Sequence, residues 1–194
     1  MSSTPNAADE PNPRQAITDL YMQLMDLKKQ IRTAALEQMG AGVPRDYVFA
    51  GEDGPVGLGE LFGERDDLLV IHNMGQGCNY CALWADGLAS LAPLIEERCA
   101  LALSSPDAPD VQAQVKRDRG WPYRMVSVQD NTFAQDMGFA DEGGYMPGVS
   151  AFHKDKAGAI TRTGAAFFGP GDDFCPIWPL FELLEGGAKG WEPR

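Results

Sequence analysis

A short apolar run, a glycine-containing loop and two closely spaced cysteines constrain this chain more than any other feature. The apolar residues occupy 68–71, two glycines follow, and the cysteines are Cys78 and Cys81. A run that is short and rich in Leu, Val and Ile is typical of a strand buried on both faces. From Cys81 onward, apolar residues recur at alternating steps of three and four, which predicts a helix. The segment 67–84 is therefore predicted to fold as strand, loop, Cys-x-x-Cys and helix.

The predicted position of the cysteines indicates redox chemistry. A thiol at a helix N-terminus faces unpaired backbone N–H groups and the positive end of the helix dipole. Both favour the thiolate, which is the form that attacks disulfides and peroxides. Because Cys81 follows Cys78 by three residues, the two share one helix face. We expect Cys78 to be the outer, attacking thiol and Cys81 the inner, resolving thiol.

Two other interpretations of the cysteine pair stay open. A structural zinc site needs four ligands, usually in two close pairs. The remaining candidates, which are His72, Cys99, His153 and Cys175, form no second close pair, and this disfavours zinc. The cysteines could also be ordinary buried residues, although a glycine-flanked position ahead of a helix favours function.

The charge and the N-terminus limit the partners. The formal net charge is −12, which opposes binding to nucleic acid or to an anionic membrane because phosphate groups need clustered Lys and Arg. Residues 1–13 are small and polar and do not resemble a secretory signal, and no apolar run approaches the length of a membrane span. We therefore expect a cytoplasmic protein with no cofactor, no nucleic-acid partner and no membrane contact. In a reducing compartment, a Cys-x-x-Cys is more often catalytic or metal-binding than a structural disulfide.

The N-terminal part is predicted to hold a disordered tail over 1–13 and a helix over 14–42. Between Ile17 and Ala34, apolar residues step 3-4-3-4-3, which is a heptad seam. Such a seam could dimerise through residues 14–39, or the helix could pack along its own domain. The sequence does not decide between these two arrangements.

The rest of the chain alternates between strand and helix signals. Asp53 and Gly54 indicate a hairpin, and Pro93 should break the helix that follows the cysteines. A strand, helix and strand in this order imply a parallel pair with a right-handed crossover. The further expected elements are strands at 99–103, 124–128, 149–152 and 159–163, a surface helix at 107–118, a short helix at 131–137, a turn at 143–144 and a helix near Pro179.

These features together resemble the thioredoxin fold, with a Cys-x-x-Cys at a helix start and a proline, Pro147, before an antiparallel hairpin. More closely, the chain is similar to a bacterial thioredoxin-like family of unknown function, described as predicted dithiol-disulfide oxidoreductases. The stretches that carry the resemblance are 46–49 with 53–54, 77–86, 119–121 and 147–152. The resemblance implies an α/β domain over 43–194, with a mixed sheet flanked by helices. It also implies a cis Met146–Pro147 bond beside the cysteines.

The leading hypothesis is a thiol–disulfide oxidoreductase in which Cys78 and Cys81 are catalytic. Asn79 and Tyr80, with Met146 and Pro147, are the expected substrate-binding residues. The partners would be a protein or small-molecule disulfide, or a peroxide, and a thiol reductant. A peroxiredoxin-like thiol peroxidase ranks second because residues 67–84 contain no Thr or Ser and no partner arginine can be placed. The remaining alternative is a non-enzymatic thioredoxin-fold interaction module.

Of the four other His and Cys residues, two have both a functional and a structural interpretation. His72 ends the predicted strand and could promote deprotonation of Cys78, but we favour a structural histidine. Cys175 could be an additional redox thiol, but we favour burial. Cys99 is expected to be an inert buried thiol, and His153 a surface residue of a strand.

Overall fold

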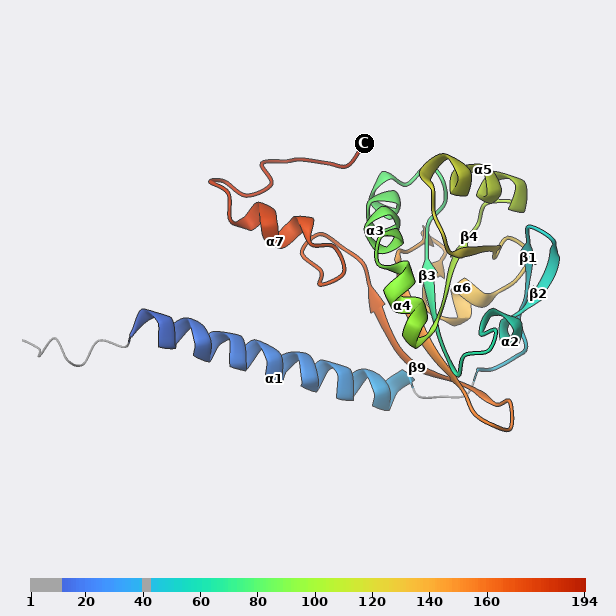
Figure 1. The fold of residues 1–194 in the computed structure, drawn as a ribbon, viewed down its shortest axis with the longest axis horizontal. Helices are drawn as coiled ribbons and strands as arrows, with labels where there is room; N and C mark the ends of the chain where they lie inside the picture. The colour runs from blue at the N-terminus through green and yellow to red at the C-terminus, as the bar shows by residue number, and fades with distance from the viewer. Residues whose placement is uncertain (1–11, 40–42) are drawn as a thin grey trace, which may run out of the picture. The chain divides into compact units, whose positions relative to one another are not determined.

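The computed structural model describes residues 12–39 and 43–194 (Figure 1), which divide into two units. The first holds one long helix, α1 (Pro13–Met39), in place of the helix predicted over 14–42. The predicted tail, apart from Asn12 and Pro13, and the last three residues of the predicted helix, 40–42, lie outside the described residues. The large apolar side chains of α1 that the structure describes are exposed by 44–67%, and they are Ile17, Leu20, Tyr21, Met22, Leu24, Met25, Leu27 and Ile31.

The second unit is built on a seven-stranded mixed sheet in the order β2-β1-β5-β4-β3-β8-β9. Its strands are β1 (Val48–Gly51), β2 (Gly54–Gly57), β3 (Asp67–His72), β4 (Ala100–Ser105), β5 (Arg124–Ser127), β8 (Gly148–Lys154) and β9 (Ile160–Phe167). β3, β4 and β5 are parallel to one another, and the outer pairs are antiparallel. This confirms the predicted mixed α/β sheet.

Strand β3 lies inside the sheet, between β4 and β8. Its register with β4 is parallel and places His72 opposite Ser104, while its antiparallel register with β8 places His72 opposite Gly148. The crossover from β3 to β4 contains two helices, α3 (Asn79–Ala89) and α4 (Ala92–Arg98). Pro93 lies in the first turn of α4, where a missing N–H costs nothing. The predicted break is therefore confirmed.

Helices cover both faces of the sheet. One face packs α2 (Leu58–Leu61) and α6 (Phe133–Asp136) in an aromatic core that includes Phe49, Phe139 and Phe152. The other packs α3, α4, α5 (Pro109–Arg119) and α7 (Ile177–Glu182) around Trp84 and Trp121. No helix in the described part of the chain is long and apolar enough to cross a bilayer.

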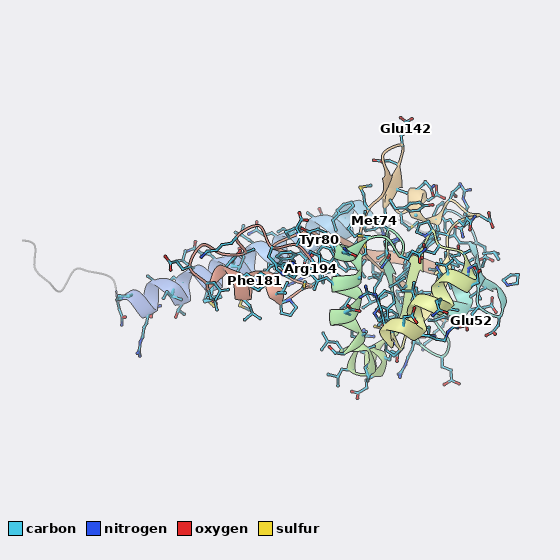
Figure 2. The ribbon with its side chains drawn as sticks, turned by 90° about the horizontal axis from the view of Figure 1, so that it is seen from above. Glu52, Met74, Tyr80, Glu142, Phe181 and Arg194 are labelled. Carbon is cyan, nitrogen blue, oxygen red and sulfur yellow. The ribbon has the colours of Figure 1, made fainter. Side chains whose placement is uncertain are left out.

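A small hairpin leads into β8. It consists of β6 (Ala140–Asp141) and β7 (Gly144–Tyr145), and Glu142 lies at its projecting tip (Figure 2). Directly after it, Gly148 opens β8 in a position that only glycine fits. A Cβ there would lie 2.2 Å from the Phe139 ring and 2.4 Å from the Ala166 carbonyl oxygen. The glycine therefore lets the Phe139 ring lie directly on the sheet.

The prediction of a cis Met146–Pro147 bond is wrong, because no peptide bond within residues 12–39 and 43–194 is cis. The backbone on both sides of this bond is already held by its neighbours. The Met146 N–H donates to the Phe139 carbonyl at 2.8 Å, and the Pro147 carbonyl accepts from the Phe168 N–H at 2.9 Å. The segment thus continues β8 with the trans bond that most X–Pro pairs adopt.

Candidate active site

Cys78 is the N-cap of α3. Its Sγ accepts a hydrogen bond from the Cys81 N–H at 3.1 Å, and its carbonyl accepts from the Ala82 N–H at 3.0 Å. The sulfur thus takes the place that a Ser or Asp oxygen usually occupies at a helix start. An N–H donor and the positive end of the helix dipole therefore both face the Cys78 sulfur.

Cys81 lies inside the protein, whereas Cys78 is half-buried. Only 3% of Cys81 is exposed, and its Sγ accepts from the Met74 N–H at 3.4 Å. Burial raises the pKa of the Cys81 thiol well above its ordinary value, and a hydrogen bond to Cys78 raises this pKa further. The expectation that Cys78 is the more accessible thiol is confirmed, and the two sulfurs are direct neighbours.

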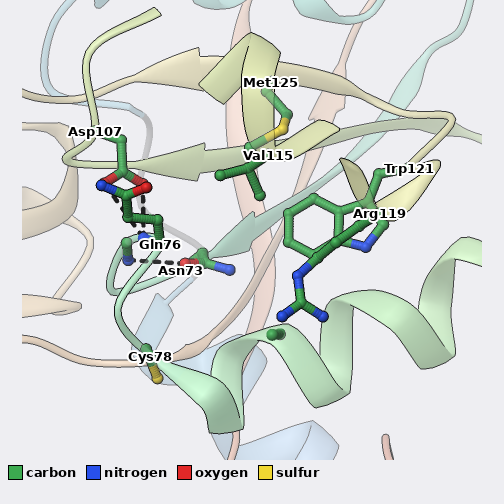
Figure 3. A pocket seen from close by; sticks show the side chains of 10 residues that line it. Asn73, Gln76, Cys78, Asp107, Val115, Arg119, Trp121 and Met125 are labelled. Carbon is green, nitrogen blue, oxygen red and sulfur yellow. Dashed lines mark hydrogen bonds between the residues drawn. The ribbon is translucent and has the colours of Figure 1, made fainter. Parts of the chain in front are cut away.

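The loop between β3 and α3 is held by Asp107, which follows β4 (Figure 3). The Gln76 N–H donates to Asp107 Oδ2 at 3.0 Å, and the Ser105 hydroxyl donates to the same oxygen at 2.9 Å. The Gly75 N–H donates to Asn73 Oδ1 at 2.8 Å. Gly75 has a φ of +108°, which favours glycine, and a Cβ there would lie 3.1 Å from Asp107. The cysteine loop is therefore held by a neighbouring strand.

The hollow between this loop and α5 is very small. It has a volume of about 10 Å³ and is lined by Cys78, Arg119 and Trp121 among others. Arg119 donates to Asp86 at 2.8 Å, and the Trp121 indole N–H donates to the same carboxylate at 2.7 Å. Figure 3 shows the Cys78 sulfur directed away from Asp107. A hollow of this size holds one water at most, so a substrate must reach Cys78 from outside the protein.

An aromatic groove lies beside the cysteine motif. It has a volume of about 330 Å³ and is lined by Tyr80, Trp178, Phe181 and Trp191, together with Pro170, Gly171, Glu182 and Ala188. The Tyr80 ring stacks on Trp178 at a centroid distance of 6.2 Å, and Trp191 contacts Trp178 at 5.9 Å and Phe181 at 5.1 Å. Figure 2 shows Tyr80 beside the start of α3. Asn79, the other residue between the cysteines, is exposed.

Met146 and Pro147 are half-buried, directly before β8. The β3–β8 register brings them to the end of β3, where the cysteine loop begins. In the described chain, no hydrogen bond joins this segment to Cys78. A role for Met146 and Pro147 in substrate binding stays a prediction.

The structural interpretation of His72 is confirmed. Its ring stacks between Phe133 and Phe139, and Nε2 forms a hydrogen bond with the Ser150 hydroxyl at 2.9 Å. Burial, together with the nearby positive charge of Arg162, lowers the pKa of His72 to about 3. His72 is thus neutral at ordinary pH and is directed to the sheet face opposite α3.

The other cysteines and histidine lie apart from the dithiol. Cys99 and Cys175 are buried, and burial raises the pKa of each thiol. His153 is exposed on β8, 2.8 Å from Asp67. Within the described ranges, no three His, Cys, Asp or Glu side chains are grouped so that they could hold a metal ion.

Sequence reasoning missed Asp107 and Trp178. Asp107 follows β4, the parallel neighbour of β3, and polar residues after neighbouring parallel strands meet at one sheet edge. That signal could have identified it. Trp178 is 98 residues from Tyr80, and no local pattern joins the two.

The comparison with protein families assigns the chain to one bacterial family. A family described as "Bacterial protein of unknown function (DUF899)" matches residues 29–192. The chain belongs to this family. The match includes the end of α1 and nearly all of the second unit.

Solved structures with the same fold include several described as peroxiredoxins. Peroxidoxin BcpB from Mycobacterium tuberculosis is 21% identical, with a TM-score of 0.52 over 66% of this chain and 84% of the other. Peroxiredoxin Q from Xanthomonas campestris is 12% identical, with a TM-score of 0.53 over 62% and 79%. An uncharacterized conserved protein from Geobacillus kaustophilus is 16% identical, with a TM-score of 0.52 over 70% of each chain. At these identities the likeness shows a thioredoxin-like fold. No curated protein matches the chain.

Proposed function

We propose that the protein is a thiol–disulfide oxidoreductase that uses Cys78 and Cys81. The observation that carries this proposal is the different placement of two adjacent sulfurs. Cys78 is half-buried at a helix N-terminus and accepts an N–H hydrogen bond, whereas Cys81 is buried and keeps its proton. An accessible nucleophile beside a protected second thiol is the arrangement that two-step disulfide exchange requires.

In the first step, the Cys78 thiolate attacks one sulfur of a substrate disulfide. The substrate S–S bond breaks, a mixed disulfide forms at Cys78, and one substrate thiolate leaves. The Cys81 N–H and the helix dipole stabilise the charge of the attacking sulfur. Because Cys81 stays protonated, it does not compete with Cys78 for the substrate.

In the second step, Cys81 attacks Cys78 Sγ. The mixed disulfide carries no charge on Cys78, so the charge that helped to raise the pKa of Cys81 is gone. The departing thiolate can take the Cys81 proton, and the Met74 N–H stabilises the new thiolate. The second substrate thiol leaves and a Cys78–Cys81 disulfide remains. The substrate has gained two electrons, which a thiol reductant of the cytoplasm then restores to the protein.

The substrate surface in this proposal lies outside the small hollow. Asn79 and Tyr80 lie beside the nucleophile, and Met146 and Pro147 lie at the end of β3. The groove that begins at Tyr80 offers aromatic rings to apolar side chains next to the substrate disulfide. A polypeptide disulfide with apolar neighbours should therefore react faster than a small hydrophilic disulfide.

The test compares two single variants. Cys78→Ser should abolish reduction of an oxidised peptide, because the attacking sulfur is gone. Cys81→Ser should accumulate a mixed disulfide, visible by mass spectrometry as the protein plus one substrate thiol. Cys99→Ala is the control for loss of an unrelated buried thiol and should reduce the peptide normally. Unchanged reduction by Cys78→Ser would refute the proposal.

A thiol peroxidase is the second candidate, favoured by the peroxiredoxin descriptions of the similar structures. Here Cys78 would attack a peroxide O–O bond, giving a sulfenic acid and releasing an alcohol or water, and Cys81 would then form the disulfide with loss of water. Arg119, the arginine nearest to this role, is bonded to Asp86. Rates with hydrogen peroxide and with a peptide disulfide, measured on one preparation, separate the two activities. Inertness toward both would leave a non-enzymatic interaction module.

A further inference from the structure

A second cavity lies on the sheet face opposite the cysteines, and its lining residues belong to α6, to the segment that follows α6 and to the edge strand β9. It has a volume of about 270 Å³, and none of its lining residues lines the hollow at Cys78. Its lining residues are Asp136, Met137, Gly138, Phe139, Arg162, Ala165 and Phe167. The set is mostly apolar, with one basic side chain, Arg162, and one acidic side chain, Asp136.

A β-bulge sets the direction of that basic side chain. In a regular strand, residues three apart point to opposite faces. Arg162 pairs with Phe152, but Gly164 pairs with Ala151, so β9 has one extra residue at this point. The bulge puts Arg162 on the same face as Ala165 and Phe167. Bulges often redirect a side chain toward a functional site.

Arg162 makes hydrogen bonds but no ion pair. Its Nη2 donates to the Met137 carbonyl at 2.9 Å and to the Ser150 hydroxyl at 3.1 Å. Its buried Nε has no acceptor, and no described carboxylate lies within ion-pair distance. Burial lowers the pKa of Arg162. The positive charge is therefore partly desolvated and lacks a counterion.

The neighbouring groups do not supply that counterion. Asp136 lines the same cavity, but its Oδ2 accepts from Tyr47 at 2.9 Å and Thr132 at 2.7 Å and lies 3.4 Å from Arg45. His72 forms a hydrogen bond with the same Ser150 hydroxyl and is neutral. Its buried Nδ1 also has no hydrogen-bond partner. Arg162 is thus the basic side chain of the lining, and no described carboxylate forms an ion pair with it.

We propose that this cavity binds a small organic carboxylate with an apolar body. A carboxylate matches the planar fork of a guanidinium and would replace its missing counterion. The Phe139 and Phe167 rings contact each other at a centroid distance of 4.9 Å and would form an apolar wall against that body, and Phe167 is 58% exposed although it lines the cavity. A phosphate group should bind more weakly than a carboxylate, because one guanidinium contacts few of the phosphate oxygens and the cavity walls are apolar.

The test measures thermal unfolding with benzoate as the probe. Benzoate should raise Tm by about 2 °C or more at saturating concentration, since a ligand that binds only the native state stabilises it. Neutral benzamide, acetate and inorganic phosphate, at matched ionic strength, should each have a smaller effect. Arg162→Gln should weaken benzoate affinity at least about ten-fold, because it removes a charged hydrogen bond. Arg124→Gln, on the exposed start of β5, removes one positive charge elsewhere and should bind like the native protein.

Because Arg162→Gln could misfold, a second variant that keeps the charge of Arg162 tests the proposal independently. Ala165→Phe leaves Arg162 in place but fills the cavity, so it should lose benzoate binding. The proposal is overturned if benzoate gives no more stabilisation than benzamide. It is also overturned if Ala165→Phe or folded Arg162→Gln binds benzoate as the native protein does. Every measurement here reports binding, so the result is independent of whether the dithiol is active.

Discussion

The buried histidine predicts how stability depends on pH. Folding lowers the pKa of His72 from 6.5 to about 3. Between these values the unfolded chain binds a proton that the native protein excludes, so the free energy of unfolding rises with pH. The contribution of His72 is thus complete above pH 6.5 and is lost as the pH falls toward 3. The perturbation that isolates it is His72→Phe, which keeps a ring between Phe133 and Phe139.

The size of the effect follows from the two pKa values. Lowering the pH from 7 to 5 should reduce the free energy of unfolding through His72 by about 2 kcal/mol. This figure depends on the unfolded pKa and on a native pKa well below 5, and it changes little if the native pKa is 2 or 4. Below pH 6 the slope approaches about 1.4 kcal/mol per pH unit.

Urea unfolding at several pH values measures this loss. All four tryptophans, at 84, 121, 178 and 191, lie in the second unit, so their fluorescence reports on the domain that contains His72. Carboxylates and His153 occur in both proteins, and their effects cancel in the difference between native and variant. The native protein should lose about 2 kcal/mol more than His72→Phe between pH 7 and 5. Equal losses would show that His72 takes up a proton without unfolding, and would refute the reasoning.

Three other predictions concern packing, assembly and substrate choice. Gly148→Ala should destabilise the domain by about 3 kcal/mol or more, because the added Cβ would overlap the Phe139 ring and the Ala166 carbonyl oxygen. The control Gly87→Ala, which has open space in α3, should not destabilise the domain. Equal urea midpoints for the two variants would contradict the prediction. If residues 14–39 dimerise, sedimentation should give a dimer and Leu24→Glu a monomer, whereas a monomeric native protein would exclude that interface. Trp191→Ala should slow reduction of an apolar peptide disulfide several-fold but leave reduction of hydroxyethyl disulfide unchanged; equal slowing of both would remove the groove from substrate binding.

The elements that the sequence predicts well are those with local signals. Pro93 separates α3 from α4, and Asp53 with Gly54 turns the β1–β2 hairpin, because a fixed φ or a left-handed φ acts within a few residues. The apolar run before Cys78 predicts β3 because only burial on both faces accounts for it. Cys78 at the start of α3 follows from the same local pattern.

Contacts between distant segments could not be predicted in this way. The pairing of β1 with β5 joins residues 50 and 127, and no periodicity selects that partner. Asp107 fixes the cysteine loop from another strand, and Trp178 stacks on Tyr80 from near the C-terminus. A cis Met146–Pro147 bond is an expectation of the resemblance and not of local chemistry, and in the structure this bond is trans, with backbone hydrogen bonds on both sides of it.

At the end of β3, neighbouring residues enter the cores on the two opposite faces of the sheet. Successive strand residues point to opposite faces, so Ile71 packs in the core beneath α3 while His72 enters the aromatic core on the other face. Asn73 then begins the loop that leads to Cys78. The sheet separates the accessible thiol from the partly buried cation of Arg162, and within residues 12–39 and 43–194 no side-chain hydrogen bond joins Cys78 to Arg162. Carboxylate binding should therefore leave the alkylation rate of Cys78 unchanged. A change in that rate on addition of benzoate would show that the two faces are coupled through β3.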